Sequence, residues 1–245
     1  LQTKNDLEKQ LSSLESVDER TSQLGEELNT MGRLLADLCG EVSQKRKQLS
    51  DSFTQRIEKE LEDVGMSAVR MKIEILQEEA DQGEDVILVK EKQYRLFTDG
   101  IDKLQYLVST NPGQPFLPMS KIASGGELSR FMLALKSLIG RHENIDTLIF
   151  DEIDAGIGGL TANQVGLKCL HLSRDKQIIC ITHLPQIAAK GHHHFVIEKS
   201  VQHNETSITL RRADLPSRIT EITRMLGEPA SEASIQLARS MLEQE

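Results

Sequence analysis

Two apolar segments of this 245-residue chain each end in side chains that could act on a phosphoryl group. Thr147–Phe150 runs directly into Asp151 and Glu152, and Gln177–Ile181 is followed two positions later by His183. Ligands of open α/β sheets bind beyond the carboxyl ends of the strands, so these side chains are expected at one site. Alternatively, the acidic pair simply begins a loop.

Each of these groups has a chemistry that suits phosphate. Asp151 is a natural Mg²⁺ ligand, because Mg²⁺ takes one or two carboxylates together with waters and phosphate oxygens. Glu152, which the pleat of an extended strand would point the other way, could orient a water for attack on a phosphoryl group. His183 could contact the transferred phosphate.

A glycine pair provides a possible anion site. Ser124, Gly125, Gly126 and Glu127 precede a strongly periodic apolar run that continues to Leu138, which predicts a helix. Glycines allow the backbone to approach an oxyanion, and the start of a helix offers free N–H groups and a positive dipole end. The spacing of Ser124 and Glu127 fits a plain capping box equally well.

The elements around these segments predict an α/β fold. A helix from about Thr161 to Leu172 separates the two apolar strands, and this order favours parallel pairing. Further strands are expected at residues 69–75 and 104–109, a hairpin at 193–200 and 206–212, and closing helices at 218–226 and 231–242.

Residues 1–64 are expected to form a long coiled-coil helix, separate from a globular domain at 65–245. They contain no proline, and apolar residues recur in steps of three and four at Leu24, Leu28, Met31, Leu35, Leu38 and Val42. After Leu49 the steps become four, which predicts docking on a globular core. The seam needs a partner helix from another segment or another molecule. An ordinary amphipathic helix of a bundle is the alternative.

Composition excludes several classes. The net charge of −9 argues against a broadly basic nucleic-acid surface, and the lack of tryptophan argues against an aromatic platform for single strands. No membrane span or secretion signal is found, and three widely spaced cysteines fit neither a zinc site nor a disulfide framework. A cytoplasmic location is expected. The chain starts at Leu1 within a helical pattern, so it is expected to be a piece of a longer protein.

Taken together, the motifs resemble those of ABC-type ATPases. Residues 124–130, SGGELSR, are similar to the signature motif, and 147–152, TLIFDE, to the Walker B strand with its catalytic glutamate. Asp154 matches the D-loop and His183 the switch histidine. A closer resemblance is to the RecN family, carried by residues 109–113, 122–130 and 180–188. The members of that family are SMC-like ATPases that act on DNA double-strand breaks.

This resemblance implies the C-terminal lobe of an ATPase head, of the P-loop NTPase fold but incomplete. Asp151 would support Mg²⁺, Glu152 would polarise the attacking water and His183 would hold the γ-phosphate of ATP. Ser124, Gly125, Gly126, Glu127 and Asp154 would contribute to nucleotide binding, with Ser124 and Gly126 reaching the ATP of a second head. DNA is the implied target, at the nucleoid, with no membrane partner.

The chain departs from the family pattern in three ways. No G-x-x-x-x-G-K-[ST] stretch occurs, so the P-loop and the outgoing coiled-coil helix are expected in an N-terminal half of the same protein. The chain alone is therefore expected to be inactive. Ala123 replaces the leucine of many ABC signatures, and Gly158 stands where the family often has serine.

Three other interpretations fit parts of the sequence. Ser124, Asp154 and His183 follow the order of a hydrolase triad, but no G-x-S-x-G elbow is present. Adjacent histidines at 192–194 would face opposite sides of a strand, which favours a turn over a metal site. A non-catalytic coiled-coil scaffold that retains an ATPase-like fold is the remaining alternative.

Overall fold

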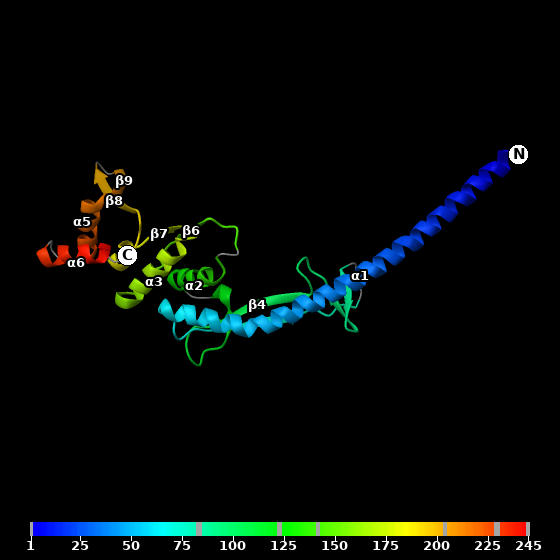
Figure 1. The fold of residues 1–245 in the computed structure, drawn as a ribbon, viewed down its shortest axis with the longest axis horizontal. Coiled ribbons are helices and arrows are strands. Elements are labelled where there is room, and N and C mark those ends of the chain that lie inside the picture. The colour runs from blue at the N-terminus through cyan, green and yellow to red at the C-terminus, as the bar shows by residue number, and fades with distance from the viewer. Residues whose placement is uncertain are drawn as a thin grey trace. The chain divides into compact units, whose positions relative to one another are not determined.

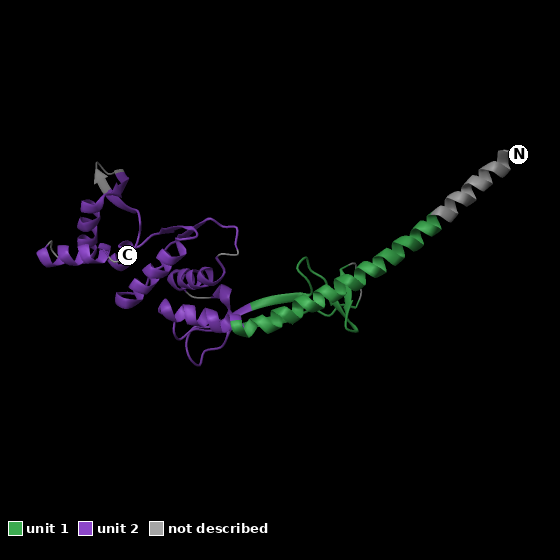
Figure 2. Cartoon of the chain, in the orientation of Figure 1, with its two compact units in different colours: residues 1–52, 73–105 green, residues 53–72, 106–245 purple. Residues whose placement is uncertain are grey.

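A computed structural model gives the structure of residues 2–81, 85–121, 124–140, 143–202, 205–227 and 231–243, with side chains described except at 2–16, 200–202 and 205. These residues form a mixed α/β fold preceded by one long helix (Figure 1), which confirms the predicted fold class. Among the helices of these ranges, none combines the length and apolar character of a membrane span. The chain divides into unit 1, residues 1–52 with 73–105, and unit 2, residues 53–72 with 106–245 (Figure 2).

The predicted arm is a continuous helix, α1, from Gln2 to Asp63. Its apolar seam lies open in this chain, since Leu28 is 71% and Leu35 40% exposed. Ile57 and Leu61, by contrast, are fully buried, as the change to steps of four predicted. The helix α1 therefore carries an exposed apolar stripe toward its N-terminus, and its C-terminal end, which we call its base, is buried.

Unit 1 contains a hairpin that sequence patterning did not reveal. Strands β2 (Val86–Val89) and β3 (Lys92–Arg95) pair antiparallel across a tight turn. Both turn residues, Lys90 and Glu91, have positive φ angles of 49° and 70°. The hairpin closes a small core against α1, whose buried members are Cys39, Ile87, Val89 and Ile101.

A three-stranded sheet follows the order β1-β4-β5. Its strands are β1 (Arg70–Gln77), β4 (Asp102–Ser109) and β5 (Leu117–Pro118), with β4 and β5 antiparallel. The first two match the strands expected at 69–75 and 104–109. A short 3-10 helix, η1 (Met119–Lys121), follows β5.

Unit 2 contains the predicted strand, helix, strand arrangement. The arrangement consists of β6 (Thr147–Phe150), α3 (Gly159–Leu172) and β7 (Gln177–Cys180), and the helix α2 (Gly125–Ile139) precedes it. β6 and β7 are parallel and in register from the Thr147–Gln177 pair to the Phe150–Cys180 pair. Because both strands end level, the segments that follow them emerge at the same edge of the sheet.

The C-terminal part also follows the predicted order. It comprises α4 (Pro185–Ala188), the antiparallel hairpin β8 (His194–Gln202) and β9 (Glu205–Ala213), then α5 (Leu215–Met225) and α6 (Glu232–Glu243). Buried Ala189, Ile222 and Ala238 join α5 and α6 to the segment after α4. The short helix α4 was not predicted.

The base of α1 is fixed to α3 within unit 2. Lys168 of α3 forms ion pairs with Glu60 and with Asp63, the latter at 3.0 Å. The chain then reverses at Gly65, whose φ of +76° suits glycine. A Cβ atom at Gly65 would also collide with the side chain of Thr161. The first turn of α3 and the end of the arm are thus packed together.

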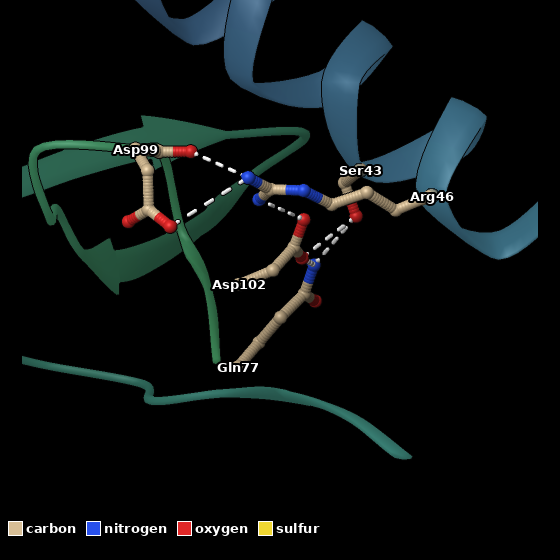
Figure 3. A network of polar contacts seen from close by, with 5 residues as sticks. All are labelled: Ser43, Arg46, Gln77, Asp99 and Asp102. Carbon is tan, nitrogen blue, oxygen red and sulfur yellow. Dashed lines mark hydrogen bonds and ion pairs between the residues drawn. The ribbon is translucent and has the colours of Figure 1, made fainter. Parts of the chain in front are cut away.

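A buried carboxylate ties α1 to β4 in unit 1 (Figure 3). Asp102 is 3% exposed and accepts hydrogen bonds from Ser43, Arg46 and Gln77 at 2.9, 3.0 and 2.9 Å. Burial alone would raise the pKa of Asp102, but the hydrogen bonds from Gln77, Arg46 and Ser43 lower it overall. Arg46 also donates to the carbonyl of Asp99 at 2.9 Å.

We expect Asp102→Asn to lower the free energy of unfolding by about 1.5–3 kcal/mol, since it removes charge-assisted hydrogen bonds from a buried site. The lowered pKa means that the ionised carboxylate adds stability above the ordinary value of about 3.9, and that this stability is lost as the pH falls through the folded-state pKa. The variant should therefore show a weaker acid dependence in urea unfolding followed by circular dichroism.

Asp99→Asn is the matched control, because the Asp99 side chain is 69% exposed and lies 3.7 Å from Arg46. It should cost less than about 1 kcal/mol. Equal losses in the two variants would contradict the structural role assigned to Asp102.

Candidate functional site

The segment after β6 places both predicted carboxylates at the surface. Asp151 and Glu152 are exposed, and Asp151 Oδ1 accepts the backbone N–H of Glu152 at 2.9 Å. Glu152 has a φ of +54°, and its carbonyl accepts the N–H of Ala155 at 3.0 Å. The expectation that strand pleating orients Glu152 is wrong, because β6 ends at Phe150 and Glu152 lies in a left-handed turn.

Asp154 and His183, which the motif resemblance compares with the D-loop and the switch histidine, are in direct contact. Asp154 is 4% exposed, and its Oδ2 accepts the Thr182 hydroxyl at 2.5 Å and the His183 N–H at 2.7 Å. His183 Nδ1 lies 3.0 Å from the same oxygen, while the His183 side chain is 76% exposed. A ring that donates its Nδ1–H to Asp154 keeps Nε2 for a ligand. Asp154 thus positions His183.

Ser124 and Glu127 form the start of α2. Ser124 is the N-cap, with extended backbone angles, and its hydroxyl accepts the Glu127 N–H at 3.2 Å. The capping role considered from the sequence is therefore real. It leaves Ser124 and Gly125 exposed at the positive end of the helix, where an anion is stabilised. The preceding Ala123 lies outside the described residues.

The two glycines permit α2 to approach the turn after β6. A Cβ atom at Gly126 would lie 2.7 Å from the Cβ of Ala155 and 3.0 Å from the carbonyl oxygen of Glu152. A Cβ atom at Gly125 would overlap the Glu152 carboxylate. The structure thus brings Gly125, Gly126 and Glu152 of one chain together.

Two further residues of the motif at 124–130, to which the sequence analysis gave no role, also contact this turn. The Ser129 hydroxyl donates to the carbonyl of Asp151 at 2.7 Å, and Arg130 Nη1 donates to the carbonyl of Ala155 at 2.7 Å. Burial lowers the pKa of Arg130 from its ordinary value. Their place one helical turn after Gly126, on the same face, is the signal that could have identified them.

Asp151 fits a Mg²⁺ ion that is held mainly by other ligands. Among the residues for which side chains are described, no group of three or more histidine, cysteine or acidic side chains could enclose a metal. Mg²⁺ does not require such a cage, because it retains waters and binds through one or two carboxylates and phosphate oxygens. A single exposed carboxylate at a strand end is compatible with that chemistry.

The other candidate sites gain no support from the geometry. His193 Nδ1 lies 2.8 Å from Arg212 of the hairpin, and His194 begins β8, as the turn interpretation predicted. Ser124 donates no described hydrogen bond to His183, and its hydroxyl is used as the helix cap. Gly158, which stands where the family often has serine, is the N-cap of α3 and makes no side-chain cap bond.

We expect Gly126→Ala to destabilise the chain by about 1–3 kcal/mol, because the added methyl group meets backbone and a buried contact. Gly125→Ala should change stability by less than about 0.5 kcal/mol, since the obstacle among the described residues is the end of the exposed Glu152 side chain. Thermal unfolding of the two variants measures the difference, and equal losses would show that α2 does not pack on the turn as described.

Comparisons with known proteins agree with the motif resemblance. None of the protein-family models matches the chain. The DNA repair protein RecN of Bacillus subtilis is 33% identical over 239 residues, which are 97% of this chain and 42% of that protein. RecN of Treponema pallidum is 35% identical over 242 residues, 98% of this chain and 39% of that protein.

Among solved structures, the Smc head domain of Pyrococcus yayanosii with a coiled coil and joint overlaps 81% of this chain and 34% of its own length, at 16% identity and a TM-score of 0.48. The RecN relationship is carried by the sequence matches. The chain spans 39% and 42% of the length of the two RecN proteins named above, and it is a homologue of that part of RecN.

Proposed function

We propose that this chain supplies one half of the ATP-hydrolysing head of an SMC-like DNA repair protein of the RecN type. The observation that carries the proposal is the gathering of Asp151, Glu152, Asp154 and His183 at the ends of two parallel strands. The similarity to RecN proteins supports DNA repair as the process. Action on double-strand breaks, in the cytoplasm at the nucleoid, is what the family resemblance implies.

The chemistry proposed is hydrolysis of ATP. Glu152 orients and polarises the attacking water, and His183, fixed by Asp154, contacts the γ-phosphate through Nε2. Asp151 would hold Mg²⁺, which neutralises charge that develops on the phosphate oxygens. Exposure of Glu152 and His183 leaves both free to meet a nucleotide that another segment holds.

Nucleotide binding is proposed to join two heads. Ser124 and Gly126 reach the γ-phosphate of ATP held by a second copy, so that ATP binding joins the heads and hydrolysis releases them. This division between copies comes from the family resemblance. Within one chain the structure places Gly125 beside the Glu152 carboxylate, and both residues are exposed. Such a cycle would open and close a clamp on DNA.

The missing partner is proposed to be an N-terminal half that carries the P-loop. The β6–β7 sheet supports this, because it has two strands and its paired Ile149 and Ile179 are 65% and 44% exposed. Ile181 continues that face and is 50% exposed. Further strands or a helix of the absent half would cover it.

The arm and the head are proposed to act as separate functional parts, with the division near residue 64. The exposed seam of α1 is suited to pair with an outgoing helix of the same N-terminal half. The compact units divide the chain differently, since the β2–β3 hairpin belongs with the arm in unit 1.

A non-catalytic scaffold is the second candidate. The exposed arm alone would serve that role, but a scaffold would have no use for an exposed imidazole whose orientation Asp154 fixes. Co-expression with a P-loop half distinguishes the two, because a scaffold would assemble without gaining ATP turnover, with or without DNA.

We expect no ATP turnover from the isolated chain, and turnover once a P-loop half is co-expressed. In that assembly, Glu152→Gln should lower kcat by about 10²–10⁴, the usual contribution of a general base. Glu41→Gln on the exposed arm is the control and should leave kcat unchanged. Turnover by the isolated chain that Glu152→Gln does not affect would refute the proposal.

The arm proposal predicts that Leu28→Glu with Leu35→Glu weakens association with the N-terminal half by at least about tenfold, because charges would enter an apolar seam. Gln23→Glu with Thr30→Glu keeps the same spacing on exposed positions away from the seam and should associate normally. Gel filtration and titration of the two halves would measure this. Equal weakening by both pairs would show that the seam is not the contact.

A further inference from the structure

The turn that carries Glu152 has an unfavourable backbone conformation. Glu152 is not glycine, yet its φ of +54° lies in the left-handed region. Such conformations cost free energy and persist only where surrounding contacts hold them. The position of the Glu152 carboxylate therefore depends on whatever holds the backbone on either side.

One face of α2 provides that support. Gly126, Ser129 and Arg130 are at i, i+3 and i+4, so they share a side of the helix. Ser129 donates to the carbonyl of Asp151, directly before Glu152, at 2.7 Å. Arg130 donates to the carbonyls of Ile153 and Ala155, one and three residues after that glutamate, at 3.4 and 2.7 Å.

Arg130 is a charged residue that is buried, although it lies close to the exposed residues Ser124 and Gly125. It is 6% exposed, and its Nε is a buried donor with no hydrogen-bond partner within the described part of the chain. Among the described residues, no acidic side chain lies within ion-pair distance of Arg130. Its guanidinium instead donates to backbone carbonyls. Both bonds come from Nη1, whose two hydrogens are held in the plane of the guanidinium, whereas the hydrogens of a lysine ammonium rotate about its stem.

We propose that Ser129 and Arg130 are positioning residues that hold the left-handed turn and thereby set the direction of the Glu152 carboxylate. The consequence for activity rests on the proposed ATPase function. Because the same helix begins with Ser124 and the glycine pair, a phosphate bound at its N-terminus would be coupled to the water-activating group through contacts within one rigid element.

The structural part can be tested without ATP turnover, by amide hydrogen exchange in the 245-residue chain. Arg130→Gln should raise exchange in residues 151–155 by about tenfold and leave β4 unchanged, and Arg130→Lys should show a smaller increase. Exchange in 151–155 equal to that of the unsubstituted chain, or an equal rise everywhere, would overturn the proposal.

Ser129→Ala covers the case in which loss of buried Arg130 prevents folding. Its matched control is Ser137→Ala, since within the described residues the Ser137 hydroxyl bonds inside α2, to the carbonyl of Leu133. Faster exchange at 151–155 is expected for Ser129→Ala alone. The same exchange rates in both serine variants would contradict the role assigned to Ser129.

The coupling to activity requires the assembly with a P-loop half. Arg130→Gln should lower kcat about tenfold with KM for ATP unchanged, and Arg130→Lys should restore part of kcat. A rise in KM with unchanged kcat would overturn the positioning role. Lack of turnover in the unsubstituted assembly would instead count against the proposed function, while the exchange result would still decide the structural claim.

Discussion

Parallel pairing of β6 and β7 is the constraint on which the candidate site depends. Their level ends bring the turn that contains Asp154 next to the turn that contains His183. The buried Asp154 carboxylate then accepts the Thr182 hydroxyl and the His183 N–H, and its position fixes the imidazole. A buried carboxylate needs such donors, so the contact stabilises the fold and orients a functional group together.

Motif and periodicity were sufficient to predict most of this architecture. The strand end at Phe150, the helix that starts after Ser124 and the long arm all follow from apolar spacing and glycine placement. The second strand was expected to reach Ile181 and ends one residue earlier, at Cys180. The β2–β3 hairpin was missed because its turn is Lys90-Glu91, which lacks the Asn-Gly or Asp-Gly signal of such turns. Tertiary packing on α1, through Ile87 and Val89, compensates for that turn.

The contacts among the candidate site residues were harder to predict from the sequence than the candidate residues themselves. The sequence indicated Glu152, but the left-handed backbone there depends on carbonyl contacts from Ser129 and Arg130, which lie far away along the chain. Likewise, the assignment of Asp154 to nucleotide binding did not include the contact seen in the structure, in which its buried carboxylate holds His183. Sequence spacing does not encode such contacts, because they arise from how α2 packs on the sheet.

The most direct measurement is a structure of the assembly of this chain with its P-loop half, bound to a non-hydrolysable ATP analogue. The account predicts Glu152 and His183 at the γ-phosphate held by their own head, and Ser124 and Gly126 at the γ-phosphate held by the opposite copy. Ser124 and Glu152 of one copy on the same phosphate, or His183 remote from any phosphate, would contradict it.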